Sequence, residues 1–361
     1  PPRSTLFPYT TLFRSRLIAA GADVNARNNF GFTPLHWARS GEAVKALLAA
    51  GADPKVTTKY GQNALHYKKD GEGVRLLLSA GVEAGALDNF GNTYLHSVKD
   101  GEGVRLLVAA GADVNARNSN DQTPLHGAVA LIGSQEQAVE LIAAGADVNA
   151  RDVVGQTPLH FGACRPEAVK ALIAAGADVN ARDANGSTPL HNATDGESVR
   201  ALLAAGADAR AIDNFGQATL HSEKDGEAVK ALIAAGAFVN ARDAIGHTPL
   251  HIVSDGEAVK ALFAAGAYAN PRSKGIPTPL HIAAREGSAE KVRALLDAGA
   301  DKCIREPSLY GRAPYDVADL PLELMERLKP GIASTLKLWF IRLMMVLAVL
   351  GVLVFLELRN L

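Results

Sequence analysis

The chain has very little of what a disulfide-linked or metal-stapled protein requires. Only two of its 361 residues are cysteines, Cys164 and Cys303, and they stand far apart in the sequence. This spacing argues against a disulfide framework and against a zinc site, and it fits a reducing compartment. We therefore expect neither a structural metal nor a cofactor.

An excess of charge of one sign is also missing. The sequence holds 37 basic and 38 acidic residues, for a formal net charge of −1. Nucleic-acid-binding domains usually carry a basic face or stripe, so the composition gives no electrostatic case for such a partner. Aromatic residues make up only 6% of the chain, which suits small helices that pack closely.

Recognisable catalytic signatures are missing as well. The sequence has no glycine-rich phosphate loop followed by lysine, no zinc-protease pattern and no nucleophile elbow. The closest approach is Gly71-Glu-Gly73, which lacks a third glycine and falls where a helix is expected to start. We expect no enzymatic activity and no small-molecule substrate.

What the sequence does contain is a strict internal period. Nine of its ten histidines share one register position, usually within Thr-Pro-Leu-His, and six of their eight spacings are 30 residues. These histidines are His36, His66, His96, His126, His160, His191, His221, His251 and His281. A period of this length is the signature of a repeat array, in which each unit stacks on the next.

Two further motifs keep the same period. Ala-Ala-Gly-Ala-Asp-Val-Asn-Ala-Arg recurs between the histidines, and Gly-Glu-Ala-Val-Lys-Ala-Leu-Leu or a close variant precedes it. Together the three motifs resemble the ankyrin repeat, and the resemblance covers residues 16–328. It implies an all-α solenoid of helix-turn-helix units joined by short hairpin loops, whose usual activity is to bind another protein.

The unit at residues 28–57 shows why these residues form two helices. Thr33 and Pro34 favour the start of a short first helix, because proline tolerates the first helical turn. Ser40, replaced by aspartate in sister units, can cap the second helix. Gly51 ends that helix by accepting a positive φ. One such unit cannot bury its own apolar face, so the units must stack.

The repeats depart from the family pattern in length and in places in sequence. The usual unit has 33 residues, whereas most units here have 30, and the deletion falls where one turn of the first helix or its loop would lie. The unit at 278–301 has the full length. Asp121 stands where the loop tip should have glycine, so we expect local weakness there.

Three segments are expected along the chain. Residues 1–15 have no helical or strand period, resemble translated adapter sequence and are interpreted as a non-native leader, with a disordered leader as the alternative. Residues 16–328 form the repeat array, ending in a degenerate capping unit from about 311 to 328. Residues 329–361 hold an apolar run, and 338–358 is long enough for a membrane helix. A packed helix or an artefactual end are the alternatives.

The family resemblance implies that loop tips and inner helices contact the partner. The tip candidates are Phe30, Tyr60, Phe90, Phe215 and Ile245, and the candidates after the register histidine are Trp37 and Tyr67. Each candidate also has a structural alternative to partner contact. A tip aromatic can pack on its own turn, and a residue after the histidine can belong to the core. We expect Lys69, Lys99 and Lys224 to be solvated charges.

The histidines themselves are interpreted as structural. In the family this side chain bonds the threonine and the neighbouring loop, so no metal is expected. His247 and His251 are four residues apart, but Pro249 starts a helix between them, and we expect them not to share a helical face.

Three functional hypotheses follow. The leading one is a cytoplasmic protein-binding scaffold anchored to a membrane by residues 338–358, with a protein partner of unknown identity. The second is the regulatory ankyrin array of a larger enzyme, with its catalytic domain upstream. The third is a soluble adaptor.

The membrane hypothesis is tested by fractionation of the full chain and of a chain that lacks residues 329–361. If residues 338–358 span a bilayer, the full chain pellets with membranes, resists extraction at high pH and is released by detergent, whereas the shortened chain stays in the supernatant. Recovery of both chains in the supernatant would remove the hypothesis.

Overall fold

The computed structural model describes residues 20–68, 70–130, 135–222, 224–271 and 275–305, and also 313, 314, 325 and 327–329. Within these residues the chain forms helices and no strand. It divides into two compact units, residues 1–214 and 215–361. The all-α solenoid expected from the period is therefore confirmed for the described part of the chain.

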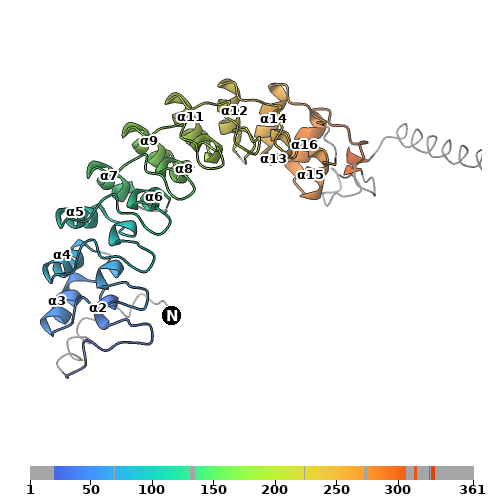
Figure 1. Cartoon of the computed structure of the whole chain (residues 1–361). Helices are drawn as coiled ribbons and strands as arrows, with labels where there is room; N and C mark the ends of the chain where they lie inside the picture. Colours follow the sequence, from blue (N-terminus) through green and yellow to red (C-terminus); the bar gives the residue numbers. More distant parts are fainter. Residues whose placement is uncertain are drawn as a thin grey trace, which may run out of the picture. The chain divides into compact units, whose positions relative to one another are not determined.

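In the first unit each repeat contributes a short first helix and a longer second helix (Figure 1). The first helices are α2 (Pro34–Trp37), η2 (Ala64–Tyr67), η3 (Tyr94–His96), α6 (Pro124–Ala130), α8 (Pro158–Gly162) and α10 (Pro189–Asn192). The second helices are α3 (Gly41–Ala49), α4 (Gly71–Ser79), α5 (Gly101–Ala109), α7 (Gln135–Ala143), α9 (Pro166–Ala174) and α11 (Gly196–Ala204). Within this unit the second helices pack one against the next from α3 to α11.

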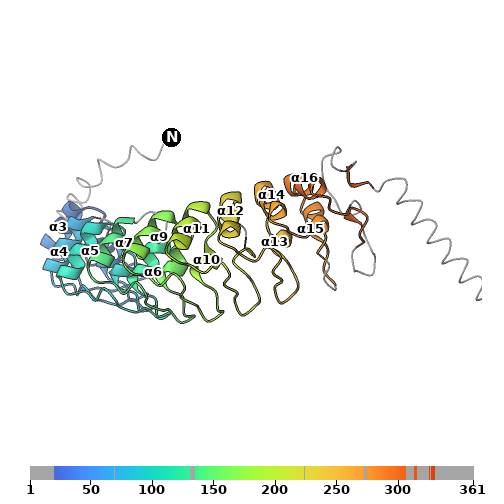
Figure 2. The same ribbon diagram turned by 90° about the horizontal axis from the view of Figure 1, so that it is seen from above.

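The second unit follows the same plan. Its described second helices are α12 (Gly226–Ala234), α14 (Gly256–Ala264) and α16 (Ala289–Asp297), and its described first helices are α13 (Pro249–Ile252) and α15 (Pro279–Arg285). Figure 2 shows the second helices α12, α14 and α16 as one row, with the loops extending away from it.

Aspartate or serine starts most second helices, as the sequence predicts. The Asp70 carboxylate accepts a hydrogen bond from the Gly73 N–H at 2.7 Å, and the Asp100 carboxylate accepts one from the Gly103 N–H at 2.6 Å. Ser40 Oγ does the same for the Ala43 N–H at 3.3 Å. These caps satisfy backbone donors that the helix itself leaves unpaired.

The 30-residue period shortens the first helix. The helices α2 and η2 contain four residues and η3 contains three, whereas α6 and α15, in the longer units, contain seven. The deletion predicted from the repeat length therefore falls in the first helix. One consequence is that carbonyl groups at the end of the shortened helix lack intrahelical partners.

Long polar side chains from the next repeat satisfy several of these carbonyls. Lys68 is only 4% exposed, and its Nζ donates to the carbonyls of Leu35 and Ala38 at 2.8 and 2.6 Å. Lys291, fully buried, donates from Nζ to the His251 carbonyl at 3.0 Å. A buried ammonium is costly unless hydrogen-bonded, so these contacts explain how a lysine can occupy the interior.

Lys224 corrects one of the sequence predictions. It was expected to be a solvated charge, but it is only 3% exposed. Lys99 is exposed as predicted. The third lysine of that prediction, Lys69, lies outside the described residues. Sequence position alone could not separate the first two, because burial depends on the space that the shortened helices leave.

Most register histidines join their own repeat to the next. The Thr33 N–H donates to His36 Nδ1 at 3.0 Å, and His36 Nε2 lies 3.2 Å from the Gln62 carbonyl oxygen. Because Nδ1 accepts a backbone N–H, a neutral ring carries its hydrogen on Nε2 and donates it to Gln62. Five more rings reach the next loop at 3.0–3.4 Å, namely His66, His96, His126, His160 and His221.

This arrangement engages both nitrogens of the imidazole. A metal ligand must offer a lone pair, but Nδ1 already accepts a hydrogen bond and Nε2 carries a hydrogen. Within the described residues there is also no cluster of three histidine, cysteine or carboxylate side chains suited to a metal. The structural interpretation of the histidines thus has a direct geometric basis.

His251 departs from the pattern. Its Nδ1 accepts the Thr248 N–H at 2.9 Å, yet its buried Nε2 has no hydrogen-bond partner among the described residues. Its ring lies beside that of His247, with centroids 5.2 Å apart. As expected, the two residues do not share a helical face, because α13 starts at Pro249 and His247 precedes its N-cap Thr248. The closeness of the two rings was not foreseen.

Asparagine forms a second set of bonds between repeats. Asn180 Nδ2 donates to the Gly206 carbonyl at 2.9 Å, and its Oδ1 accepts the Asp208 N–H at 2.8 Å. Asn149 and Asn115 make the same pair of bonds to the repeats that follow them. The position is occupied by Lys55 and Gly85 in the second and third loops, so those loops lack this link.

The core of each repeat is aliphatic. The leucine before each register histidine is at most 1% exposed, and so is the valine near the start of most second helices, including Val44 and Val74. Burying one such side chain contributes about 1.5–3 kcal/mol, so the repeated leucine and valine supply most of the stabilisation.

The two ends of the chain bear on the remaining predictions. The leader at residues 1–15, most of the expected capping unit and the apolar run at 338–358 lie outside the described residues. No helix in the described part of the chain has the length and apolar character to cross a membrane. Near the end of the array, Leu328 is buried and Arg327 Nη2 donates to Asp297 of α16 at 2.6 Å.

Asp121 offers a test of the loop geometry. It is the one described residue other than glycine with positive φ, at 56°, where sister loops have glycine. Replacing Asp121 with glycine should raise the free energy of unfolding by about 1 kcal/mol, because a β-carbon is disfavoured in this conformation. Urea unfolding of the full chain measures the change.

The reciprocal variant is Gly91→Asp in the preceding loop. A β-carbon there would approach the Ser119 nitrogen to 3.1 Å, so this variant should lose more than Asp121→Gly gains. A lower urea midpoint for Asp121→Gly would contradict the geometry.

The histidines predict a loss of stability in acid. Burial is the main cause that lowers the pKa of His251 to about 4, with the neighbouring His247 adding to it, and burial lowers the pKa of His36, His96 and His126 as well. A lowered folded-state pKa means that the unfolded chain binds more protons. Stability is therefore complete above about pH 6.5 and falls as the pH drops toward the folded-state pKa.

For His251 the loss between pH 7 and pH 4 amounts to at most about 3 kcal/mol. The urea midpoint should fall over this range, and less so for His251→Gln. The control Leu250→Val should lower the midpoint equally at both pH values, since it removes buried volume without a titrating group. A midpoint of the wild-type chain that does not change with pH would refute this account.

Candidate partner-binding surface

The loop tips are turns closed by an asparagine or aspartate side chain. In the first loop Asn28 Oδ1 accepts the N–H groups of Phe30 and Phe32 at 2.9 and 3.0 Å. Asp88 accepts the N–H groups of Phe90 and Asn92 in the same way, both at 2.9 Å. These bonds fix the backbone on both sides of the tip residue.

Neighbouring tips are also bonded to one another. The Lys59 N–H donates to the Phe30 carbonyl, the Asn89 N–H to the Tyr60 carbonyl and the Ser119 N–H to the Phe90 carbonyl, each at 2.9 Å. In the second unit the Ala244 N–H donates to the Phe215 carbonyl at 2.7 Å. The tips therefore form rows in which the side chains have fixed positions relative to each other.

The predicted tip candidates lie on this surface. Phe30, Tyr60 and Phe90 are between 45% and 59% exposed, and in the second unit Phe215 and Ile245 are 53% and 67% exposed. A tip aromatic that packed on its own turn would be more buried than this. In the first unit the row of Phe30, Tyr60 and Phe90 follows three successive repeats; we call it the tip row.

Trp37 and Tyr67 belong to a separate aromatic cluster on the first helices. The Phe32 ring lies 5.2 Å from the Trp37 ring and 5.2 Å from the Tyr67 ring, and His36 lies 5.9 Å from Tyr67. Trp37 is 54% exposed, whereas Tyr67 is half-buried and donates its hydroxyl to Gln62. The sequence named two of these rings; Phe32, the one that joins them, was not foreseen.

A hollow opens beside this cluster. It has a volume of about 410 Å³ and is lined by His66, Tyr67, Lys68, Tyr94, Ser97, Lys99 and Asp100. It lies between two of the short first helices of the unit, η2 and η3. We call it the Tyr67 hollow. Tyr94 stands where most sister repeats have proline, and burial raises the pKa of its hydroxyl, which donates to the Lys68 carbonyl.

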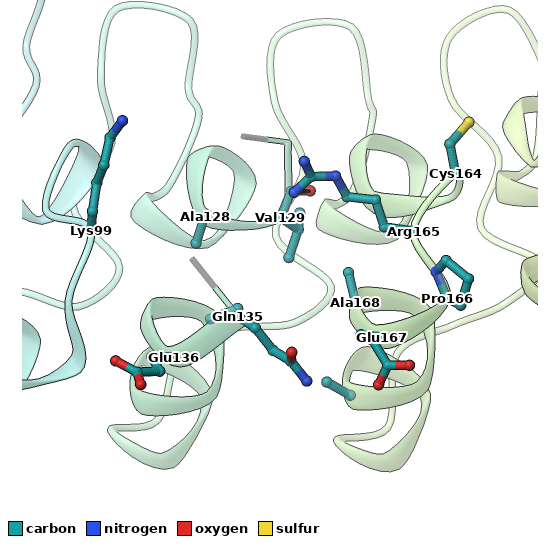
Figure 3. A pocket seen from close by; sticks show the side chains of 12 residues that line it. Lys99, Ala128, Val129, Gln135, Glu136, Cys164, Arg165, Pro166, Glu167 and Ala168 are labelled. Atoms are coloured by element: carbon teal, nitrogen blue, oxygen red, sulfur yellow. Dashed lines mark hydrogen bonds between the residues drawn. The ribbon is translucent and has the colours of Figure 1, made fainter. Parts of the chain in front are cut away.

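A larger hollow of about 520 Å³ lies among α6, α7 and α9 (Figure 3). Its floor is apolar, formed by Ala128, Val129 and Ala168, among others. In Figure 3 Lys99 and Arg165 border it on the side of the first helices, and Glu136 and Glu167 border it on the side of the second helices. Lys99 lines both hollows.

Several exposed apolar side chains were not among the sequence candidates. Leu87 and Val153 in the first unit, and Phe238 and Tyr268 in the second, are between 42% and 65% exposed. The sequence could have indicated three of these residues, because each replaces the residue that usually recurs at its position. Leu87 replaces the recurring arginine, and Phe238 and Tyr268 replace the loop aspartate.

The geometry of the described residues offers surfaces for contact. The exposed residues lie on rigid loops and short helices, and the buried histidines are held in hydrogen bonds that link repeats. Hydrophobic side chains that are displayed on a rigid framework are the usual anchors of a protein interface.

Comparison with known proteins agrees with this architecture. The family model described as ankyrin repeats (3 copies) matches residues 12–68, 67–152, 128–213 and 215–306. A search of curated proteins finds no match. The matched ranges cover most of the chain, and together with the stacked helix pairs and the histidine links they show that this chain belongs to the ankyrin repeat family.

Proposed function

We propose that this chain is a protein-binding scaffold whose partner contacts the tip row of the first unit. Ankyrin repeats generally serve protein–protein interaction, and this supports the general part of the proposal. The tip row supports the specific part. Three large aromatic side chains are exposed at one register position of three successive repeats.

The exposure of these three rings on ordered loops favours the binding of a partner. An isolated exposed aromatic residue is ordinary, but here three are presented at the same position of successive loops that hydrogen bonds join. Since the backbone is already ordered, a partner that binds there loses little conformational entropy of the scaffold. Trp37 and Tyr67 form a second contact area of the same unit, and Phe215 and Ile245 are the corresponding candidates in the second unit.

We further infer that residues 338–358 anchor the array to a membrane. The support is the length and apolar character of the run in the sequence. A cytoplasmic position of the array is inferred from the basic residues at the repeat end of that run, namely Lys329 and Lys337 before it and Arg342 near its start.

The tip row is tested by affinity capture with the full chain as bait. The variant Phe30→Ala, Tyr60→Ala, Phe90→Ala should lose the specific partner by tenfold or more, because anchor aromatics typically contribute about 1–2 kcal/mol or more each. Quantitative mass spectrometry of the captured proteins measures the loss. Stability should change little, since these side chains lie on the surface.

The matched control changes three exposed residues on the second helices of the same repeats: Glu42→Gln, Glu72→Gln and Glu102→Gln. It should capture the same partner as the wild-type chain. An unchanged partner list for the tip variant, or equal loss in the control, would refute the role of the tip row.

A further inference from the structure

We infer that the Tyr67 hollow binds an acidic peptide segment of a protein partner, with a carboxylate at Lys99 and an apolar side chain against Trp37 and Tyr67. This inference deepens the proposed function, since it assumes a protein partner and names the chemistry of one contact. It concerns a different surface from the tip row.

The hollow exists because the first helices are short. η2 and η3 have four and three residues, whereas α6 has seven, and the space that a further turn would occupy is left between the second and third repeats. Its volume of about 410 Å³ lies within the range of sites that accept a ligand or a few side chains.

One cation that lines the hollow, Lys99, has no carboxylate partner among the described residues. Lys99 is exposed and forms no ion pair or hydrogen bond within the described residues, and the same holds for Arg39, its register equivalent in the first repeat. On the second helices, in contrast, Arg75 pairs with Glu102 at 2.9 Å and Arg105 pairs with Glu140. Lys68 adds a buried positive charge at the floor.

The carboxylates near the hollow are already engaged. The Asp70 and Asp100 side chains accept the N–H groups of Gly73 and Gly103 at the starts of α4 and α5. Their charge is directed at those helix starts, where it complements the helix dipole. A carboxylate from outside is therefore the group that Lys99 can pair with.

The aromatic side of the hollow sets the second requirement. Tyr67 lines the hollow and also contacts Phe32, which contacts the exposed Trp37. An apolar or aromatic side chain next to the acidic residue would cover these rings and remove them from water. The peptide that fits the hollow therefore has an acidic residue next to a large apolar one, in an extended or loop segment.

The test selects a random peptide library on the immobilised full chain. The expected result is enrichment of aspartate or glutamate beside tryptophan, phenylalanine or leucine. The peptide found in this way should bind the Lys99→Glu variant about tenfold more weakly, and added salt should reduce the difference. Replacing the acidic residue of the peptide with lysine should restore binding to Lys99→Glu and weaken binding to the wild-type chain.

The matched control is Lys45→Glu, an exposed lysine on α3 that does not line the hollow. It should leave the affinity of the selected peptide unchanged. Trp37→Ala should weaken binding without altering its dependence on salt. Enrichment without acidic residues, equal affinity for Lys99→Glu, or equal loss in Lys45→Glu would each overturn the inference.

The two proposals fail separately. If the peptide selection fails while the tip-row variant still loses its captured partner, only the assignment of the Tyr67 hollow is wrong. If the selected peptide behaves as expected while the tip variant captures the same partner, the tip row is wrong and the hollow stands.

Discussion

The structure depends on the fact that a single repeat cannot bury its own apolar face. A helix pair of some 30 residues leaves one side of its leucine and valine side chains uncovered, and only the next repeat can cover it. Packing of this kind is tolerant of sequence and gives no unique register by itself. The register comes from polar links, because register histidines such as His36 reach a carbonyl of the next loop and asparagines such as Asn180 bond the glycine carbonyl of the next repeat.

The shortened first helix changes how that interface is completed. A missing turn removes apolar contact and leaves carbonyl groups without partners, and a buried carbonyl is costly when unpaired. Lys68 and Lys291 compensate by reaching from the next repeat to these carbonyls. Between the second and third repeats these side chains do not fill the space that the missing turn leaves, and the Tyr67 hollow is the result. The same deletion therefore explains an unusual buried lysine and an unusual surface hollow.

The division between framework and surface follows from these constraints. Positions that join repeats accept only residues with the right hydrogen-bonding groups, and so they recur along the chain. Phe30, Tyr60 and Phe90 accept their inter-repeat bonds at the backbone carbonyl, which leaves their side chains free to vary. In the first three repeats that freedom is used for Phe30, Tyr60 and Phe90, and in later loops of the first unit for Asn120, Val154 and Asn185. The aromatic surface is accordingly concentrated in the first three repeats of that unit.

The sequence by itself determined the period, the helix pairs, the helix caps and the positions of the loop tips, because each rests on local hydrogen bonding or on the spacing of apolar residues. It also placed the deletion in the first helix or its loop. Only the tertiary structure decided which lysine is buried, that Phe32 joins Trp37 to Tyr67, that His247 lies against His251, and that a hollow remains beside Tyr67. These features depend on distances between residues of different repeats, or across a bend in the backbone. No local pattern encodes the space that one shortened helix leaves for its neighbour.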